Sequence, residues 1–273
     1  MPVRAVVFDL FDTLVDLDLA ALPRVALRDG SVPSTLGALH AALPGVPLDV
    51  LAGALSEIDR AWRRGEGAQG RELPTLERFA RLAARLGLDD PALALRLTEV
   101  HMGLIAALAR TPAHHAPLLA RLRGRVRIGI CSNFSHAPTA RALLGEAGLA
   151  PHLDAVVISH EHGLRKPRRE IFEAVLDALG TPPEETLHVG DDLAADVTGA
   201  AALGIRTGWL TRRVADPDAA RARFPEASPD WILKDLGEIE PLLEMLHQLS
   251  GASPGSPSVG SNQARMRPFS SRG

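Results

Sequence analysis

The chain has 273 residues, of which 46% are hydrophobic and 23% charged, and a formal net charge of −3. This length suits one large domain or a core with an inserted smaller domain. The acidic balance argues against nucleic acid as the main partner, because phosphate backbones require an excess of basic residues. Cys131 is the only cysteine, which excludes an intramolecular disulfide and a cysteine-based metal cluster.

Targeting signals and membrane spans are not expected. The N-terminal residues MPVRAVVFD hold too short an apolar run for a secretory signal. No apolar run approaches the roughly 18 residues that a membrane span needs. We therefore expect a cytoplasmic protein without a membrane partner, and the sequence leaves open whether it is a monomer or a homodimer.

Five short β-rich runs in chain order predict the strands of one sheet. They lie at residues 3–8, 126–131, 155–158, 186–189 and 205–210. Helical patterns between the later runs, at residues 136–146, 167–179 and 193–203, stop at or near glycine. Strands that alternate with helices predict an α/β fold with a Rossmann-like parallel sheet covered on both faces.

Residues 17–110 have a different pattern. Apolar residues recur there at three- and four-residue steps, which predicts amphipathic helices over 48–62, 76–86 and 93–108. We find no convincing strand in this segment, so an all-helical insertion is expected between core segments 1–16 and 111–249. Residues 250–273 are rich in Ser, Gly and Pro, a composition that predicts a disordered tail.

Polar side chains follow four of the predicted strands, where parallel α/β sheets place their active sites. They are Asp9, Thr13, Ser132, Asn133, Lys166, Asp191, Asp192 and Asp196. Lys166 is one of only two lysines in a chain rich in arginine, which suggests a position where arginine does not serve. We expect these residues to meet in one crevice.

These residues resemble, in order and in kind, the four motifs of the haloacid dehalogenase-like hydrolases, over about residues 3–16 and 112–210. The helical insertion resembles that family's cap of the first type. The resemblance implies that Asp9 is the nucleophile. It also implies Mg²⁺ as the cofactor, held by Asp9, Asp191 and the main-chain carbonyl of Phe11.

The resemblance implies roles for the remaining motif residues as well. Asp196 would act through metal-bound water, with Asp192 as a further candidate. Thr13, Ser132 and a backbone N–H near Asn133 would donate hydrogen bonds to phosphoryl oxygens, and Lys166 would keep Asp9 ionised. A competing interpretation is that Asp191 and Asp192 cap the following helix.

One position departs from the family's phosphatase pattern. Most such phosphatases carry a second aspartate two residues after the nucleophile, as general acid. Here that position is Phe11, and Asp12 is a candidate for proton transfer. A phosphatase acting through an aspartyl-phosphate, a metal-independent 2-haloacid dehalogenase and a catalytically weak phosphate-binding protein all stay open. The acidic fourth motif favours the phosphatase, because dehalogenases need no metal.

The cap is expected to select a small soluble phosphorylated metabolite. Arg71 and Glu72, in the loop between two predicted cap helices, are candidates to face the substrate. Arg60, Arg63 and Arg64 are alternatives.

Overall fold

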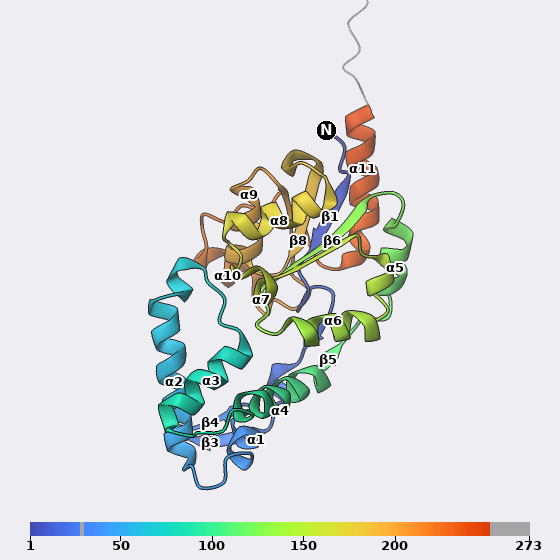
Figure 1. Ribbon diagram of the computed structural model, residues 1–273. Coiled ribbons are helices and arrows are strands. Elements are labelled where there is room, and N and C mark those ends of the chain that lie inside the picture. Colours follow the sequence, from blue (N-terminus) through green and yellow to red (C-terminus); the bar gives the residue numbers. More distant parts are fainter. Residues whose placement is uncertain (28–29, 252–273) are drawn as a thin grey trace, which may run out of the picture.

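The computed structural model describes residues 1–27 and 30–251 (Figure 1). Its centre is a sheet of six parallel strands, and the predicted α/β fold class is confirmed. Across the sheet the strands are β10 (Trp231–Leu233), β9 (Arg206–Leu210), β8 (Thr186–Gly190), β1 (Ala5–Phe8), β6 (Arg127–Ser132) and β7 (Ala155–Ile158). Phe8 of β1 lies opposite Ile130 of β6 and Val189 of β8, so these three strands end side by side.

Both faces of the sheet are buried, as the continuous apolar run of β1 requires. Val6 and Phe8 join the core on the face covered by α5, α6 and α11, whereas Ala5 and Val7 join the core on the α8 and α9 face. The helices of this part are α5 (His115–Leu122), α6 (Ala137–Glu146), α7 (Ser159–His162), α8 (Arg169–Leu179), α9 (Gly199–Ala201), α10 (Pro217–Arg223) and α11 (Ile239–Gly251).

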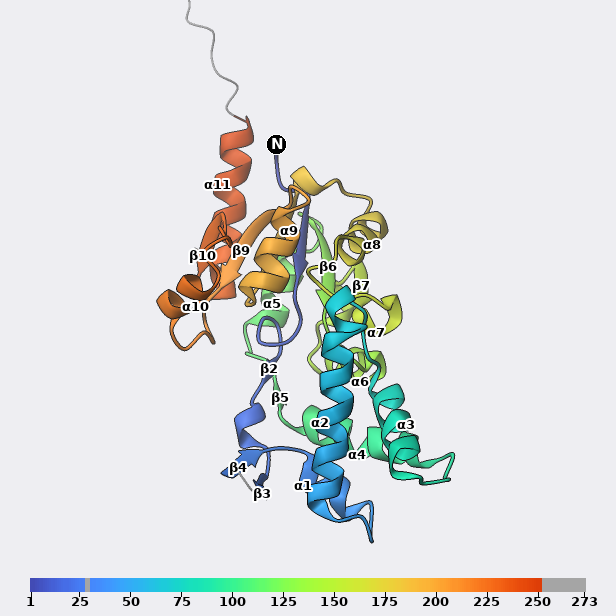
Figure 2. The ribbon, with the colours of Figure 1, turned by 90° about the vertical axis from the view of Figure 1, so that its left-hand side faces the viewer.

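A second cluster of elements lies beyond the end of the sheet toward which β1 runs (Figures 1 and 2). It is connected through β2 (Asp16–Leu17) and β5 (Ala109–Arg110), which pair in antiparallel fashion. Its helices are α1 (Leu36–Ala41), α2 (Leu48–Arg64), α3 (Thr75–Leu86) and α4 (Leu93–Ala107). They enclose an apolar core of their own around Leu51, Phe79 and Leu97. We call this cluster the cap.

The cap is not purely helical, which corrects one sequence expectation. β3 (Arg24–Leu27) and β4 (Gly30–Pro33) form an antiparallel hairpin. The sequence does hold a signal for it, an Asp-Gly dipeptide at residues 29–30 between short β-prone runs. That signal was missed because the runs are short and most of their residues are exposed.

Two other helical segments differ from the sequence prediction. The predicted helix over 193–203 is a π-helical turn, η5 (Leu193–Thr198), followed by the short α9. α11 continues to Gly251, and the rest of the predicted disordered tail lies outside the described residues. Single 3₁₀ turns occupy Leu19–Ala21, Gly67–Gln69, Ala150–His152, Pro183–Glu185 and Leu236–Glu238. None of the helices within 1–27 and 30–251 is long and apolar enough to cross a membrane.

Candidate active site

Asp9 lies at the carboxyl end of β1 in the middle of the sheet, beside a buried lysine. The Nζ atom of Lys166 lies 2.6 Å from Oδ1 of Asp9 and 2.6 Å from Oδ1 of Asp196. The Lys166 side chain is only 2% exposed, and a buried ammonium must be paired to remain charged. Burial alone would lower the pKa of Lys166, but the carboxylates of Asp196 and Asp9 raise it above its usual value. Lys166 is therefore a fixed positive charge next to Asp9.

Asp196 is anchored as firmly as the lysine. Its Oδ1 also accepts from Nε2 of His188, at 2.9 Å, and its Oδ2 accepts from the amide of Asp192 at 3.1 Å. Burial alone would raise the pKa of Asp196, but Lys166 and His188 hold that pKa well below its usual range. His188 was not singled out from the sequence; its only signal is a histidine between Leu187 and Val189 in the buried strand β8.

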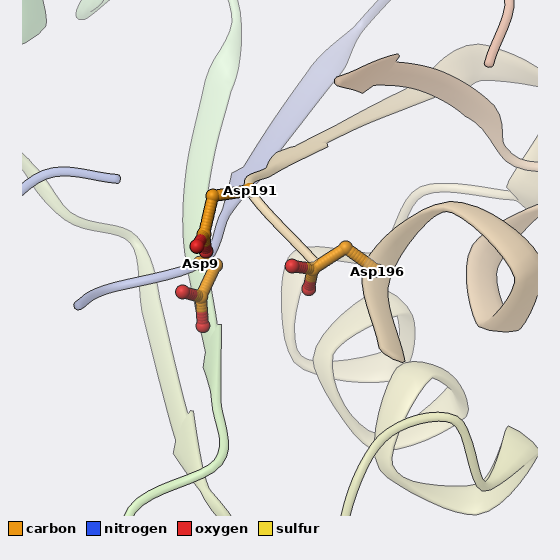
Figure 3. A group of neighbouring side chains, drawn as sticks. All are labelled: Asp9, Asp191 and Asp196. Carbon is orange, nitrogen blue, oxygen red and sulfur yellow. The ribbon is translucent and has the colours of Figure 1, made fainter. Parts of the chain in front are cut away.

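Three carboxylates converge at this edge of the sheet. One carboxylate oxygen from each of Asp9, Asp191 and Asp196 lies within 4.8 Å of the other two. Figure 3 shows the three side chains. Burial raises the pKa of Asp9 to about 6, although Lys166 opposes the shift. Burial, and then the charges of Asp9 and Asp196, raise the pKa of Asp191 to about 8. The protein alone therefore disfavours full ionisation of this acidic group.

A divalent cation would relieve this repulsion. Hard carboxylate oxygens are the ligands that Mg²⁺ prefers, and a bound cation favours the ionised form of each carboxyl group. The donor set of Asp9, Asp191 and Asp196 thus fits a magnesium ion. The structure leaves Asp196 less available than the others, because it already accepts from Lys166 and His188.

Two hydroxyl groups at the same edge are buried without partners. Thr13 is 0% exposed and Ser132, the last residue of β6, is 1% exposed. Among the described residues, neither hydroxyl oxygen has a hydrogen-bond partner. A buried, unsatisfied hydroxyl costs roughly 1–3 kcal/mol, so both groups are suited to donate to a ligand that carries oxygen acceptors.

The sequence profile of the haloacid dehalogenase-like hydrolases matches residues 3–204. The chain belongs to this family. It is 32% identical to pyrimidine 5'-nucleotidase YjjG of Escherichia coli (strain K12) over 169 residues, 61% of this chain and 69% of that protein. It is 33% identical to phosphoglycolate phosphatase of Rhodospirillum rubrum over 205 residues, 74% of this chain and 77% of that protein.

A solved structure extends the likeness to nearly the whole fold. The 2-haloacid dehalogenase from Pseudomonas syringae pv. Tomato DC3000 matches with a TM-score of 0.64 and 23% identity, covering 89% of this chain and 99% of that one. At this identity the match supports the shared fold. The two relatives compared by sequence carry the names of phosphatases, and the structure that shares the fold is named a dehalogenase.

In the turn after Asp9, the side chain of Asp12 contacts Arg213, whereas the side chain of Phe11 packs against Phe134. Asp12 has a left-handed backbone, with φ 59°, a conformation that aspartate tolerates better than most residues. Its Oδ1 forms an ion pair with Nε of Arg213 at 2.7 Å and accepts a hydrogen bond from the amide of Leu17 at 3.1 Å. The ring of Phe11 packs against that of Phe134, with centroids 4.4 Å apart. Arg213 was not predicted, because nothing local in the sequence links it to Asp12.

Asn133 contacts the main chain of Lys166. Its Nδ2 donates to the Lys166 carbonyl at 3.0 Å, and its Oδ1 accepts from the Lys166 amide at 2.8 Å. The side chain therefore ties the loop after β6 to the loop that carries the lysine. The side-chain contacts do not test the predicted phosphate contact, because that contact involves a backbone N–H near Asn133. It stays a prediction.

Asp192 lies at the start of η5 and accepts from the amides of Ala194 and Ala195, each at 2.8 Å. Its side chain is thus an N-cap, as the competing interpretation of this motif expected. The same interpretation does not account for Asp191, whose carboxyl group belongs to the acidic group described above.

Glu72 contacts the core and also lines a hollow of about 260 Å³ between the cap and the core loops. Its side chain is only 2% exposed and accepts from Nη1 of Arg165 at 2.9 Å, from the Leu73 amide at 2.9 Å and from the hydroxyl of Ser159. These contacts occupy the carboxylate that was expected to face the substrate. Arg71 is exposed, and its carbonyl accepts from Nε1 of Trp62 at 3.2 Å.

Proposed function

We propose that this hydrolase removes the phosphoryl group from a small soluble phosphomonoester, with Asp9 as nucleophile and Mg²⁺ as cofactor. The observation that carries the proposal is the acidic group of Asp9, Asp191 and Asp196, whose ligand atoms lie within 4.8 Å of one another. When these three carboxyl groups are ionised, their mutual repulsion favours the binding of a cation. The names of the nucleotidase and phosphoglycolate phosphatase relatives agree with this chemistry.

Mg²⁺ would be held by the carboxylates of Asp9 and Asp191 and the main-chain carbonyl of Phe11, with Asp196 and Asp192 acting through bound water. When bound, the ion would offset the negative charges of the carboxylates and of the phosphoryl group. Nucleophile and substrate are both anionic, so this charge compensation is a requirement of the reaction.

The remaining steps follow from the protein's own residues. Lys166, 2.6 Å from Asp9, keeps the carboxylate ionised. The hydroxyls of Thr13 and Ser132 donate to the phosphoryl oxygens. Asp9 attacks phosphorus, and the bond from phosphorus to the leaving oxygen breaks to give an aspartyl-phosphate. Water then attacks this phosphorus, which releases inorganic phosphate and regenerates the carboxylate.

The leaving oxygen needs a proton, and Phe11 has none to give. The carboxylate of Asp12 is already engaged, because its Oδ1 lies 2.7 Å from Nε of Arg213 in an ion pair and also accepts from the amide of Leu17. We infer that proton delivery is weak in this protein, whether Asp12, a cap residue or water performs it. Substrates with good leaving groups should therefore react fastest.

The alternative function is that of a 2-haloacid dehalogenase, which the phenylalanine at position 11 favours. Halide leaves without a proton, so Phe11 suits that reaction. Burial of Asp191 beside Asp9, with a pKa raised to about 8, argues against it, because a metal-free reaction gains nothing from a second carboxyl group there. A phosphate-binding protein with little activity is the remaining possibility.

Hydrolysis of 4-nitrophenyl phosphate with Mg²⁺ or with EDTA tests the proposal. We expect turnover with Mg²⁺, none with EDTA, and a loss of at least about a thousandfold in Asp9→Asn. Asp89→Asn, at an exposed position in the cap, is the matched control and should retain turnover. Halide release from 2-chloropropionate in EDTA would support the dehalogenase instead. Neither activity, with phosphate still bound, would support the binding protein.

A further inference from the structure

The cap contains a hollow of about 390 Å³. It lies among the hairpin β3–β4 and helices α1, α2 and α4, and most of its lining is apolar. The apolar lining includes Leu22, Leu27, Leu36, Leu39, Leu55 and Ile105. Packed protein interiors leave few voids larger than a water molecule, whereas small-molecule pockets measure roughly 300–1,000 Å³. The size and lining of the hollow are those of a ligand pocket.

Polar groups on its wall are mutually compensated. Arg78 donates to Asp59 through two contacts, at 2.7 and 2.6 Å. Nδ1 of His101 lies 2.7 Å from the hydroxyl of Thr35. Burial, and then the charge of Arg78, lower the pKa of His101 to about 4, so its ring is neutral at physiological pH. These groups offer hydrogen bonds but little net charge.

Arg63 is the exception. It lines this hollow and also a second one of about 260 Å³. Among the described residues, the structure gives its guanidinium no hydrogen bond or ion pair. An uncompensated cation beside apolar walls suits a ligand with an apolar body and a negatively charged group.

Two sets of residues place the hollow beside the core elements that carry the active site. Leu22 and Ile105 of its wall belong to the apolar cluster against which Phe11 and Phe134 pack, and Phe11 is two residues from Asp9. The second hollow shares Asp59, Arg63, Arg78 and His101 with the first. It is also lined by Ser135, from the loop that follows Ser132 at the end of β6, and by Arg165, next to Lys166.

We propose that the hollow binds the organic part of the phosphomonoester and selects an apolar body that carries an anionic group, such as a carboxylate, for Arg63. This inference rests on the proposed function, because it assigns the leaving group of the same reaction. Very short substrates would leave the hollow empty and would gain nothing from its apolar walls.

The first test compares three aryl phosphates on the full chain with Mg²⁺. We expect kcat/KM to be about tenfold higher for 2-naphthyl phosphate than for phenyl phosphate, because the second ring is buried. We expect 4-carboxyphenyl phosphate to exceed phenyl phosphate by about fivefold, the value of one partly exposed charge pair.

Variants separate these preferences from leaving-group effects. Arg63→Gln should remove most of the carboxyphenyl-to-phenyl ratio, whereas Arg64→Gln, the next residue on α2 and outside both hollows, should keep the wild-type ratio. Ser56→Trp places a large side chain in the first hollow from an exposed position. It should remove most of the naphthyl-to-phenyl ratio.

Binding of 2-naphthoate, measured by calorimetry, tests the hollow without catalysis. We expect binding that weakens about fivefold or more in Arg63→Gln and in Ser56→Trp, and stays at the wild-type value in Arg64→Gln. Aryl phosphate turnover with ratios equal in all variants, or no binding of 2-naphthoate, would overturn this inference and leave the proposed function intact. No turnover, with 2-naphthoate bound in the expected order, would overturn the phosphatase and retain the hollow as a binding site.

Discussion

Lys166 is the residue on which the electrostatics of the site depend. Its compact ammonium lies 2.6 Å from both Asp9 and Asp196 in a nearly solvent-free position. An arginine would place a larger planar group with five donors in a fixed fork at this buried position, whereas the ammonium of lysine is a compact point charge. The rarity of lysine in this sequence was therefore informative. Asn133 contacts the main chain of Lys166, and His188 contacts Asp196. No local sequence pattern predicts either contact.

Phe11 leads to a prediction about leaving groups. Without an acid at this position, turnover should fall steeply as the pKa of the leaving alcohol rises. Phe11→Asp should raise the rate on an alkyl phosphate relative to 4-nitrophenyl phosphate by about 10- to 100-fold. Phe11→Ala, which loses the same packing against Phe134 without adding a carboxyl group, is the control. Equal wild-type rates on alkyl and aryl phosphates would contradict the account.

Asp191 leads to a prediction about pH. Its pKa in the metal-free fold is raised to about 8 from 3.8, so its neutral form is favoured. The stability that it contributes is complete below its unfolded pKa and is lost as pH rises toward about 8. Mg²⁺ needs the ionised form, so its affinity should fall by up to about tenfold for each pH unit below the raised pKa.

Thermal unfolding with and without Mg²⁺, from pH 5.5 to pH 8.5, measures this effect. The melting temperature should gain more from Mg²⁺ at pH 8 than at pH 6. Asp191→Asn should abolish the gain and reduce the pH dependence of the metal-free protein, while Asp89→Asn should behave as wild type. A gain from Mg²⁺ that is independent of pH would count against Asp191 as a ligand.

At the scale of elements, the cap loop before α3 is joined to the core loop that leads to Lys166. The amide of Glu72 donates to the Gly163 carbonyl at 2.9 Å, and the amide of Arg165 donates to the Gly70 carbonyl at 2.8 Å. The side chain of Glu72 adds its contacts to Arg165 and Ser159. The position of the cap is thereby coupled to the residue next to the catalytic lysine.

Glu72→Gln should weaken this junction. Loss of the buried charge leaves Arg165 without its anion, and the free energy of unfolding should fall by about 1–3 kcal/mol. Amide exchange at residues 70–75 and 159–165 should accelerate, measured by hydrogen–deuterium exchange. Glu77→Gln, which breaks the exposed pair with Arg81, should cost less than about 1 kcal/mol. Equal effects of the two substitutions would contradict a docking role for Glu72.

The elements also differ in how far the sequence specified them. Five strands of the sheet give short β-rich runs, and α2, α3 and α4 give clear helical periodicity, so these elements were predictable. Strand β10 and helix α1 were not predicted, because each is short. The hairpin β3–β4 is short and mostly exposed, which leaves a weak pattern. A substrate contact of Glu72 stays a prediction, and its partners in the core were not predictable, because a sequence does not reveal which carboxylates find partners. Its contacts with Ser159 and Arg165 join residues more than 80 positions apart.

At the scale of the molecule, the sheet carries the candidate catalytic residues and the cap carries the proposed substrate hollow. The parallel strands bring Asp9, Ser132 and Asp191 to one edge, and the cap lies beyond that edge (Figure 2). The cap also holds the hollow of about 390 Å³. Arg212 and Arg213, in the loop after β9, reach back to Asp16 of β2 and to Asp12 in the turn after Asp9. Motif order was enough to predict the shared edge. The arginine contacts were not predictable, because they span about 200 residues.

The fate of the water oxygen tests the central claim most directly. The protein is incubated in H₂¹⁸O and Mg²⁺ with 4-nitrophenyl phosphate and 2-chloropropionate together. An aspartyl-phosphate opened by water at phosphorus places ¹⁸O in inorganic phosphate and leaves the carboxyl group of Asp9 unlabelled. An aspartyl ester formed by displacement of chloride is instead opened at its acyl carbon, which labels Asp9. We predict label in phosphate alone; chloride release with label in the peptide that contains Asp9 would contradict the account.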